Sequence, residues 1–80
     1  MALVIFSSEL QEFTGEERTE VSATSYRVLI DVLVAKYSRL SFDQLTDLAV
    51  AIDGVIIVDP LLEPLSSDTE VHFLHFVAGG

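Results

Sequence analysis

The middle of the chain carries the clearest pattern of hydrophobic and polar positions, and this pattern predicts a helix that opens at Ser25. Apolar side chains recur three or four residues apart, which is the spacing of one stripe on an amphipathic helix. The charged residues of the segment lie off this stripe. We expect two of its members, Leu29 and Leu33, to be core residues. The full stripe comprises Tyr26, Leu29, Ile30, Leu33, Val34 and Tyr37.

A second, shorter helix is predicted directly after the first, which we expect to end between Ser38 and Leu40. Ser41 and Gln44 resemble a capping box, in which each side chain satisfies a backbone N–H group at the start of a helix. The apolar residues that this short helix would carry are Phe42, Leu45 and Leu48.

Short apolar runs before the helices predict two strands. Residues 3–6 are rich in β-branched and aromatic side chains, as in a strand that is buried largely on both faces. Residues 16–22 are a plausible second strand. The polar segment 7–15 between them contains a turn residue, Gly15, and we expect it to form the long loop of a hairpin.

The second half of the chain predicts three more strands. The dipeptide Asp53-Gly54 separates two apolar runs and is a strong signal for a two-residue hairpin turn. Proline then interrupts regular structure twice before the last strand. The predicted strands are Ala49–Ile52, Val55–Val58 and Val71–Val77. The interrupting prolines are Pro60 and Pro64, and a turn is predicted at Ser66–Asp68.

This order of elements predicts the fold class. A hairpin, a crossing helix, a short helix and three further strands within 80 residues point to one mixed sheet wrapped around one main helix. That is the β-grasp, or ubiquitin-like, arrangement, and its class is α+β. We expect a single domain over residues 1–80, with residues 78–80 as an extended tail.

Composition narrows the set of partners. Thirteen acids against four bases give a formal net charge of −9. Such a surface repels the phosphates of nucleic acid and anionic membranes, so neither is an expected partner. It suits a protein with a basic face, although acidic surfaces also serve solubility alone.

Several other chemistries are excluded or disfavoured. The chain has no cysteine, which rules out disulfides and thiolate zinc sites. His72 and His75 stand an odd number of residues apart on a predicted strand, so they face opposite sides and we expect no shared metal ion. No secretion signal and no apolar run of about 18 residues is present, so we expect a soluble, cytoplasmic protein.

The last two residues, Gly79 and Gly80, suggest chemistry at the chain end. Glycine has no Cβ, so its backbone can enter a channel that is too narrow for side chains. The terminal carboxylate, ionised at neutral pH, could attack ATP on an activating enzyme and form an acyl-adenylate. A sulfur donor could then displace AMP and leave a thiocarboxylate. The competing interpretation is an ordinary flexible terminus.

The predicted last strand divides into two faces. If Val71 and Phe73 face the core helix, Leu74 and Phe76 lie on the other side together with His72. An apolar pair that leads into the tail would form a docking patch for a partner. The alternative is ordinary packing of the sheet beneath a loop.

Motifs along nearly the whole chain resemble those of the small subunit of molybdopterin synthase, within the wider family of ubiquitin-like sulfur carriers that also serves thiamin synthesis. The N-terminal part resembles that subunit's first hairpin. The middle part stands where the family commonly has a Val-Asn-Gly type turn, with Asp53 in place of the Asn. The matching residues are Ile5-Phe6, Glu9-Leu10, Phe13-Thr14-Gly15, Thr19-Glu20-Val21, Ile52-Asp53-Gly54, Pro64-Leu65-Ser66, Asp68, Glu70-Val71 and Val77-Ala78-Gly79-Gly80.

The resemblance implies a sulfur carrier that is not an enzyme on its own. It implies a thiocarboxylate on Gly80, an ATP-dependent activating enzyme as one partner and a large synthase subunit as another. No cofactor would be bound to the chain itself, since ATP would be used by the activating partner. The residues expected to contact the partners are Gly79, Ala78, Val77, Phe76, Leu74 and His72.

One departure from the family keeps the sulfur acceptor open. Many synthase subunits carry a Pro-Pro pair where this chain has His75-Phe76. The chain could therefore serve another pathway, such as the synthesis of thiamin or cysteine. Two further alternatives are a ubiquitin-like modifier joined to lysines through Gly80 and a plain interaction domain whose tail has no chemical role.

Overall fold

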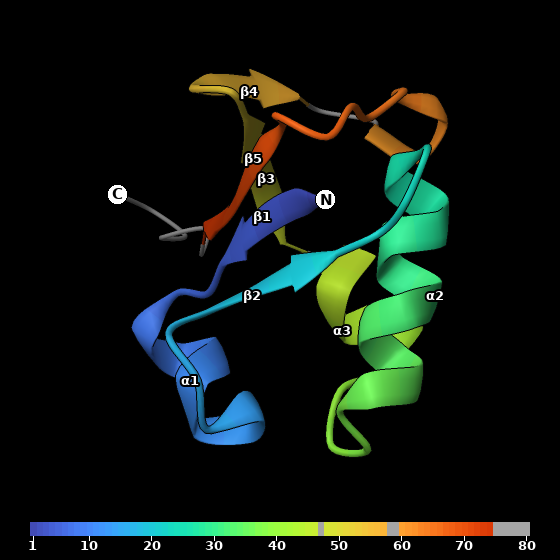
Figure 1. Ribbon diagram of the computed structural model, residues 1–80. Helices are drawn as coiled ribbons and strands as arrows, with labels where there is room; N and C mark the ends of the chain where they lie inside the picture. Colours follow the sequence, from blue (N-terminus) through green and yellow to red (C-terminus); the bar gives the residue numbers. More distant parts are fainter. Residues whose placement is uncertain (47, 58–59, 75–80) are drawn as a thin grey trace.

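A computed structural model describes residues 1–46, 48–57 and 60–74. It shows a five-stranded mixed sheet with the longest helix on one face (Figure 1), so the predicted β-grasp arrangement and α+β class are confirmed. The elements in chain order are β1 (Ala2–Ile5), α1 (Ser8–Thr14), β2 (Arg18–Val21), α2 (Tyr26–Lys36), α3 (Phe42–Thr46), β3 (Ala49–Ile52), β4 (Val55–Ile57), the 3₁₀ turn η1 (Pro60–Leu62) and β5 (Glu70–Leu74).

The first and last strands of the chain lie side by side at the centre of the sheet. The strand order is β2-β1-β5-β3-β4. Strand β1 pairs with β2 as the predicted antiparallel hairpin and with β5 in parallel, while β3 pairs antiparallel with both β4 and β5. Strand β5 therefore has a hydrogen-bonded neighbour on each side, which fixes the direction in which the chain leaves the sheet.

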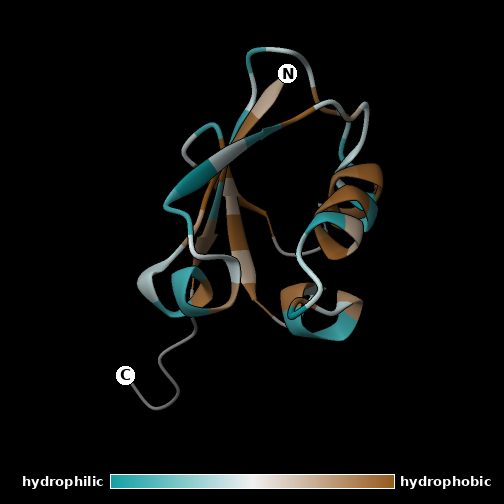
Figure 2. Cartoon of the chain, turned by 60° about the horizontal axis from the view of Figure 1, so that its bottom comes forward, coloured by the Kyte–Doolittle hydropathy of each residue, from teal (hydrophilic) through white to brown (hydrophobic). Residues whose placement is uncertain are grey.

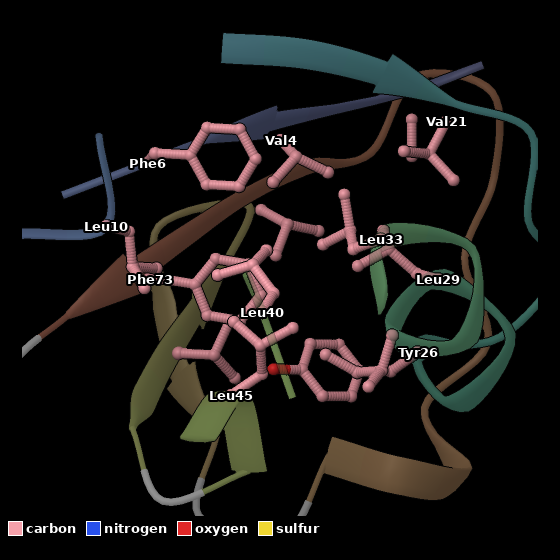
Figure 3. Packing of buried hydrophobic residues seen from close by; sticks show 14 of the residues in the cluster. Val4, Phe6, Leu10, Val21, Tyr26, Leu29, Leu33, Leu40, Leu45 and Phe73 are labelled. Atoms are coloured by element: carbon pink, nitrogen blue, oxygen red, sulfur yellow. The ribbon is translucent and has the colours of Figure 1, made fainter. Parts of the chain in front are cut away.

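Helix α2 packs one of its faces into the core beneath the sheet. Its N-cap is Ser25, whose hydroxyl accepts a hydrogen bond from the backbone N–H of Val28, and its C-cap is Tyr37. The predicted stripe faces the sheet, and both Leu29 and Leu33 have no exposed surface. Figure 3 shows these side chains packed among Val4, Leu45 and Phe73. The predicted helix and its core face are confirmed.

The aromatic residue at the start of α2 lies in the same core. Tyr26 is 1% exposed, and burial raises the pKa of its phenol, which stays neutral at physiological pH. Its ring lies 6.2 Å from that of Phe73 on β5, measured between centroids. The contact ties the helix to the strand that leads into the tail.

The capping box that the sequence predicted for the second helix is present. The Gln44 side chain accepts from the backbone N–H of Ser41 at 3.3 Å, and the Ser41 hydroxyl accepts from the N–H of Gln44 at 3.1 Å. Leu45 is fully buried and Phe42 packs against the core. Leu48 also packs against the core, but it lies beyond the last residue of α3.

The loop predicted between the first two strands is wrong for most of its length, because Ser8–Thr14 forms helix α1. The Ser7 hydroxyl accepts from the backbone N–H of Leu10 as an N-cap, and Gly15 adopts a left-handed conformation as the C-cap. Within α1 only Leu10 is buried. A single buried residue produces no recognisable stripe, so the capping residues at the two ends were the available signal.

The turn between β3 and β4 has the predicted two-residue form. Asp53 and Gly54 both have positive φ, at 51° and 83°, as a turn of this kind requires. Strand β4 is described as far as Ile57, and the Val58 assigned to it from the sequence lies outside the described residues.

We expect Gly54→Ala to lower the free energy of unfolding by roughly 1–2 kcal/mol. A Cβ placed on Gly54 would meet no atom within 4 Å, so the cost comes from the left-handed backbone alone. Urea denaturation measures it. Gly54→Asn is the matched control, since asparagine tolerates this conformation better than alanine and should cost less. Equal stability of the alanine variant and the wild type would contradict the assigned turn.

Candidate functional site

Strand β5 positions the site because the chain continues from its end into the tail. Val71 and Phe73 are buried against the core, while His72 and Leu74 are partly exposed on the opposite face. The alternation predicted for these four residues is confirmed. The other residues that we assigned to the site lie outside the described residues: His75, Phe76, Val77, Ala78, Gly79 and Gly80.

The neighbours of β5 extend its exposed face across the sheet. Residues aligned in neighbouring strands point to the same side, and His72 aligns with Ile5 on β1 and with Ala51 on β3. Ala51 in turn aligns with Ile56 on β4, which is 63% exposed. We name the resulting surface, on the side of the sheet away from α2, the outer face. Its apolar members are Leu3, Ile5, Ala49, Ala51, Ile56 and Leu74.

The hydropathy of the residues differs between the strands of the sheet. In Figure 2 strand β3 is tan to brown along its length, whereas β2 includes teal segments. The polar residues Arg18 and Glu20 of β2 are exposed and align with Ile5 and Leu3. The outer face is thus apolar over β1 and β3, mixed over β5, where Glu70 and His72 accompany Leu74, and polar at the β2 edge. A mixture of apolar and polar side chains is typical of surfaces that bind other proteins.

A small polar network fixes the start of β5. The Nε2 atom of His72 lies 2.9 Å from a carboxylate oxygen of Glu70 on the outer face. The backbone N–H of Glu70 donates to the carboxylate of Asp53 at 2.9 Å, and the N–H of Asp53 donates to the carbonyl of Glu70 at 2.8 Å. These two hydrogen bonds tie the β3–β4 turn to the start of β5 and hold β5 in register with β3.

Charge is distributed unevenly along the chain. All four Lys and Arg residues come before Ser41, so the sequence of β3, β4 and β5 and of their connections contains acids but neither lysine nor arginine. Two of these acids, Asp53 and Glu70, are exposed beside the outer face. An apolar surface with an acidic rim complements an apolar surface with a basic rim.

Sequence reasoning found the β5 residues of this surface but missed those on the other strands. Ile5 and Ala51 join His72 only through the register of the sheet, which no local pattern reveals. The hydrogen bonds between Asp53 and Glu70 were missed for the same reason, although Asp53 was assigned to the turn.

Two other properties of the described residues bear on function. None of them gathers three or more histidine, cysteine, aspartate or glutamate side chains into a group that could bind a metal ion. Over the same ranges, every helix is too short or too polar to cross a bilayer.

The five-stranded mixed sheet packed on one main helix is the fold of ubiquitin-like proteins, the class to which the small sulfur carriers belong. The sequence pattern of the ThiS family matches residues 4–80, so the chain belongs to the ThiS family. Carriers of this kind are not enzymes themselves. No curated protein matches the chain.

Solved structures with the same fold come from a bacterium and an archaeon. CysO, in the BexX/CysO complex from Amycolatopsis orientalis, has a TM-score of 0.80 and 19% sequence identity, with 100% of each chain covered. SAMP1 from Haloferax volcanii has a TM-score of 0.75 and 20% identity, with 99% of this chain and 98% of the other covered. At this identity the likeness shows the fold alone.

If the outer face docks a partner, Leu74→Glu should weaken that association at least about tenfold, because it places a charge on the apolar part of the surface that lies next to the tail in sequence. The melting temperature should stay close to that of the wild type, since Leu74 is only partly buried. Isothermal titration calorimetry with the purified partner measures the affinity, and a thermal scan measures stability.

Val28→Glu is the matched control for this variant. Val28 is 40% exposed on α2, on the other side of the sheet from the outer face, so the same change of charge there should leave affinity unchanged. A large loss of stability in Leu74→Glu would instead identify Leu74 as a core residue and would remove it from the docking surface.

Proposed function

We propose that the protein carries sulfur on its C-terminal carboxylate, at Gly80, as the small subunit of molybdopterin synthase. The observation that supports this most directly is the continuity of the central strand with the tail. Strand β5 is paired on both sides and is described as far as Leu74, and the sequence then continues to Val77-Ala78-Gly79-Gly80. Partners can therefore bind the folded domain while the chain end, which has little side-chain bulk, reacts.

The chemistry takes place at that carboxylate. One of its oxygens attacks the α-phosphorus of ATP on the activating enzyme, and pyrophosphate leaves. The sulfur donor then attacks the carbonyl carbon of the acyl-adenylate, and AMP leaves with the oxygen that had attacked phosphorus. The product is a thiocarboxylate whose sulfur is a good nucleophile. The chain supplies the group that is modified, and its partners supply the catalytic residues.

The outer face could bind the two partners that the proposal requires, one after the other. The activating enzyme and the large synthase subunit must each hold the same domain while the tail reaches their reaction centres. A partly exposed apolar surface beside the tail, with acids at its rim, can be buried and released repeatedly by proteins with basic rims. Its acidic surroundings would also speed their encounter with the carrier.

A carrier for a different sulfur acceptor is the second candidate, and one feature favours it. His75-Phe76 replaces the Pro-Pro pair of many synthase subunits, so the segment before the tail differs from that of the resembled family. CysO, in the BexX/CysO complex, and SAMP1 have the same fold, so the fold alone does not distinguish one sulfur acceptor from another. Both candidates use the same chemistry at Gly80 and differ in the protein that receives the sulfur.

Intact-protein mass spectrometry tests the proposal. The purified protein is incubated with the adenylating enzyme encoded in the same genome, ATP and sodium sulfide. We expect a gain equal to the mass difference between sulfur and oxygen, located in the C-terminal peptide and absent without ATP. If the mass is unchanged, or if the gain maps away from Gly80, the proposal is wrong.

Affinity capture then separates the candidates. Recovery of a large synthase subunit on the immobilised carrier, together with sulfur transfer to a pterin precursor, supports molybdopterin synthase. Sulfur transfer to a different acceptor supports the second candidate. Higher-mass conjugates of the carrier in cell extract, joined through Gly80 to lysines, would indicate a protein modifier instead.

A further inference from the structure

The chain contains very few side chains that could attack an activated acyl group. Amines and thiols are the groups that capture such electrophiles, and the 80 residues include no cysteine and one lysine, Lys36. This matters for the proposed function, because the acyl-adenylate of Gly80 in one copy could be consumed by an amine of another. The product would be a dimer that can no longer be loaded with sulfur.

The amine of Lys36 is held by two buried side chains. Its Nζ atom donates a hydrogen bond to the Thr19 hydroxyl at 2.6 Å and lies 5.2 Å from the centre of the Tyr37 ring. Thr19 is 7% exposed and Tyr37 8% exposed, so neither anchor can readily follow the amine outward. Lys36 as a residue is exposed, but its reactive atom is tethered against β2.

An attack by this amine would require it to leave both anchors. The nitrogen must turn its lone pair toward the carbonyl carbon, which breaks the hydrogen bond to Thr19 and withdraws it from the ring of Tyr37. A charge-assisted hydrogen bond and a cation–π contact both favour the tethered position. The tether therefore lowers the fraction of molecules in which the amine is free to react.

We propose that the contacts of Lys36 with Thr19 and Tyr37 withhold the chain's one lysine side chain from acyl transfer, so that Lys36 is a poor acceptor of the activated C-terminus of another copy. The inference rests on the proposed function. In the suppressed reaction Nζ forms an amide bond with the Gly80 carbonyl carbon, the carbonyl–oxygen bond to AMP breaks, and the amine loses a proton to water.

A C-terminal thioester of the chain tests this without an activating enzyme. The thioester, made by thiol cleavage of an intein fusion, is mixed with free wild type, Thr19→Val, Thr19→Ser or Lys36→Arg as the acceptor. Mass spectrometry and peptide mapping then measure the rate at which dimers linked through Lys36 form. Because no ATP or sulfur is involved, the result is independent of whether the sulfur-carrier function holds.

We expect Thr19→Val to form the Lys36-linked dimer at least about tenfold faster than the wild type, in line with the loss of one charge-assisted hydrogen bond. Thr19→Ser keeps the hydroxyl and should match the wild type, and Lys36→Arg should give no such link. Equal rates for Thr19→Val and the wild type would overturn the proposal.

A second measurement does not depend on the fold of the variants. The same thioester is offered to the folded wild type and to a synthetic peptide of residues 26–39, in which Lys36 has no partner from β2. The proposal predicts that Lys36 is acylated more slowly in the folded protein than in the peptide, by a factor similar to that expected between the wild type and Thr19→Val. Equal or faster acylation in the folded protein would contradict it.

Discussion

Adding one residue after Gly80 should abolish sulfur loading, by more than about a thousandfold, while the domain remains folded. The extension converts the reactive carboxylate into an ordinary amide and moves the new terminus beyond the reaction centre. Gly79→Trp should have an effect of similar size, because it places a large side chain where a narrow channel accepts backbone only. Loading is measured as the gain in mass after incubation with activating enzyme, ATP and sulfide.

Two controls isolate the chemistry from folding. Glu20→Gln, on the polar β2 edge of the sheet, should load at the wild-type rate, and thermal scans should show the same melting temperature for all three variants. Loading that persists in the extended chain would show that Gly80 does not carry the reactive group.

The largest effect on stability is expected for Leu33→Ala, at about 2–5 kcal/mol. Leu33 is fully buried at the centre of α2, and its removal leaves a cavity between the helix and the sheet. A domain of this size is stable by only about 4–12 kcal/mol, so the variant should lose a large part of its stability and melt at least about 10 °C lower. Denaturant and thermal unfolding both measure the loss.

Val28→Ala provides the comparison within the same helix. Val28 is partly exposed, so its truncation removes less buried surface and should cost below about 1 kcal/mol. Similar losses for the two variants would contradict the assignment of the buried face of α2.

The elements that could be predicted from the sequence are those specified by local signals. The stripe from Tyr26 to Tyr37, the capping box at Ser41 and the turn at Asp53 each depend on residues a few positions apart. Helix α1 was missed because it is short and carries only two apolar side chains, Leu10 and Phe13, too few to form a recognisable stripe. The strand order could not be read locally, since β1 and β5 come from opposite ends of the chain and meet only in the folded sheet.

The same distinction applies to the site. Gly80 was predicted from the chemistry of a chain end, and Leu74 and His72 from alternation along one strand. Their neighbours Ile5 and Ala51 required the register between strands, because a shift of one residue would have sent them to the other face. The Lys36 tether to Thr19 likewise links an α-helix to a strand that lies 17 residues earlier in the sequence.

The double pairing of β5 also has a mechanical consequence. A partner that draws the tail into a channel pulls along the axis of β5, and its backbone hydrogen bonds to β1 and β3 run across that axis. The pull therefore loads both ladders in shear, so several bonds must break together before the strand can slide. A strand at the edge of the sheet would have resisted the same force with one ladder. Because β5 lies at the centre of the sheet, the domain should stay folded when a partner pulls on the tail.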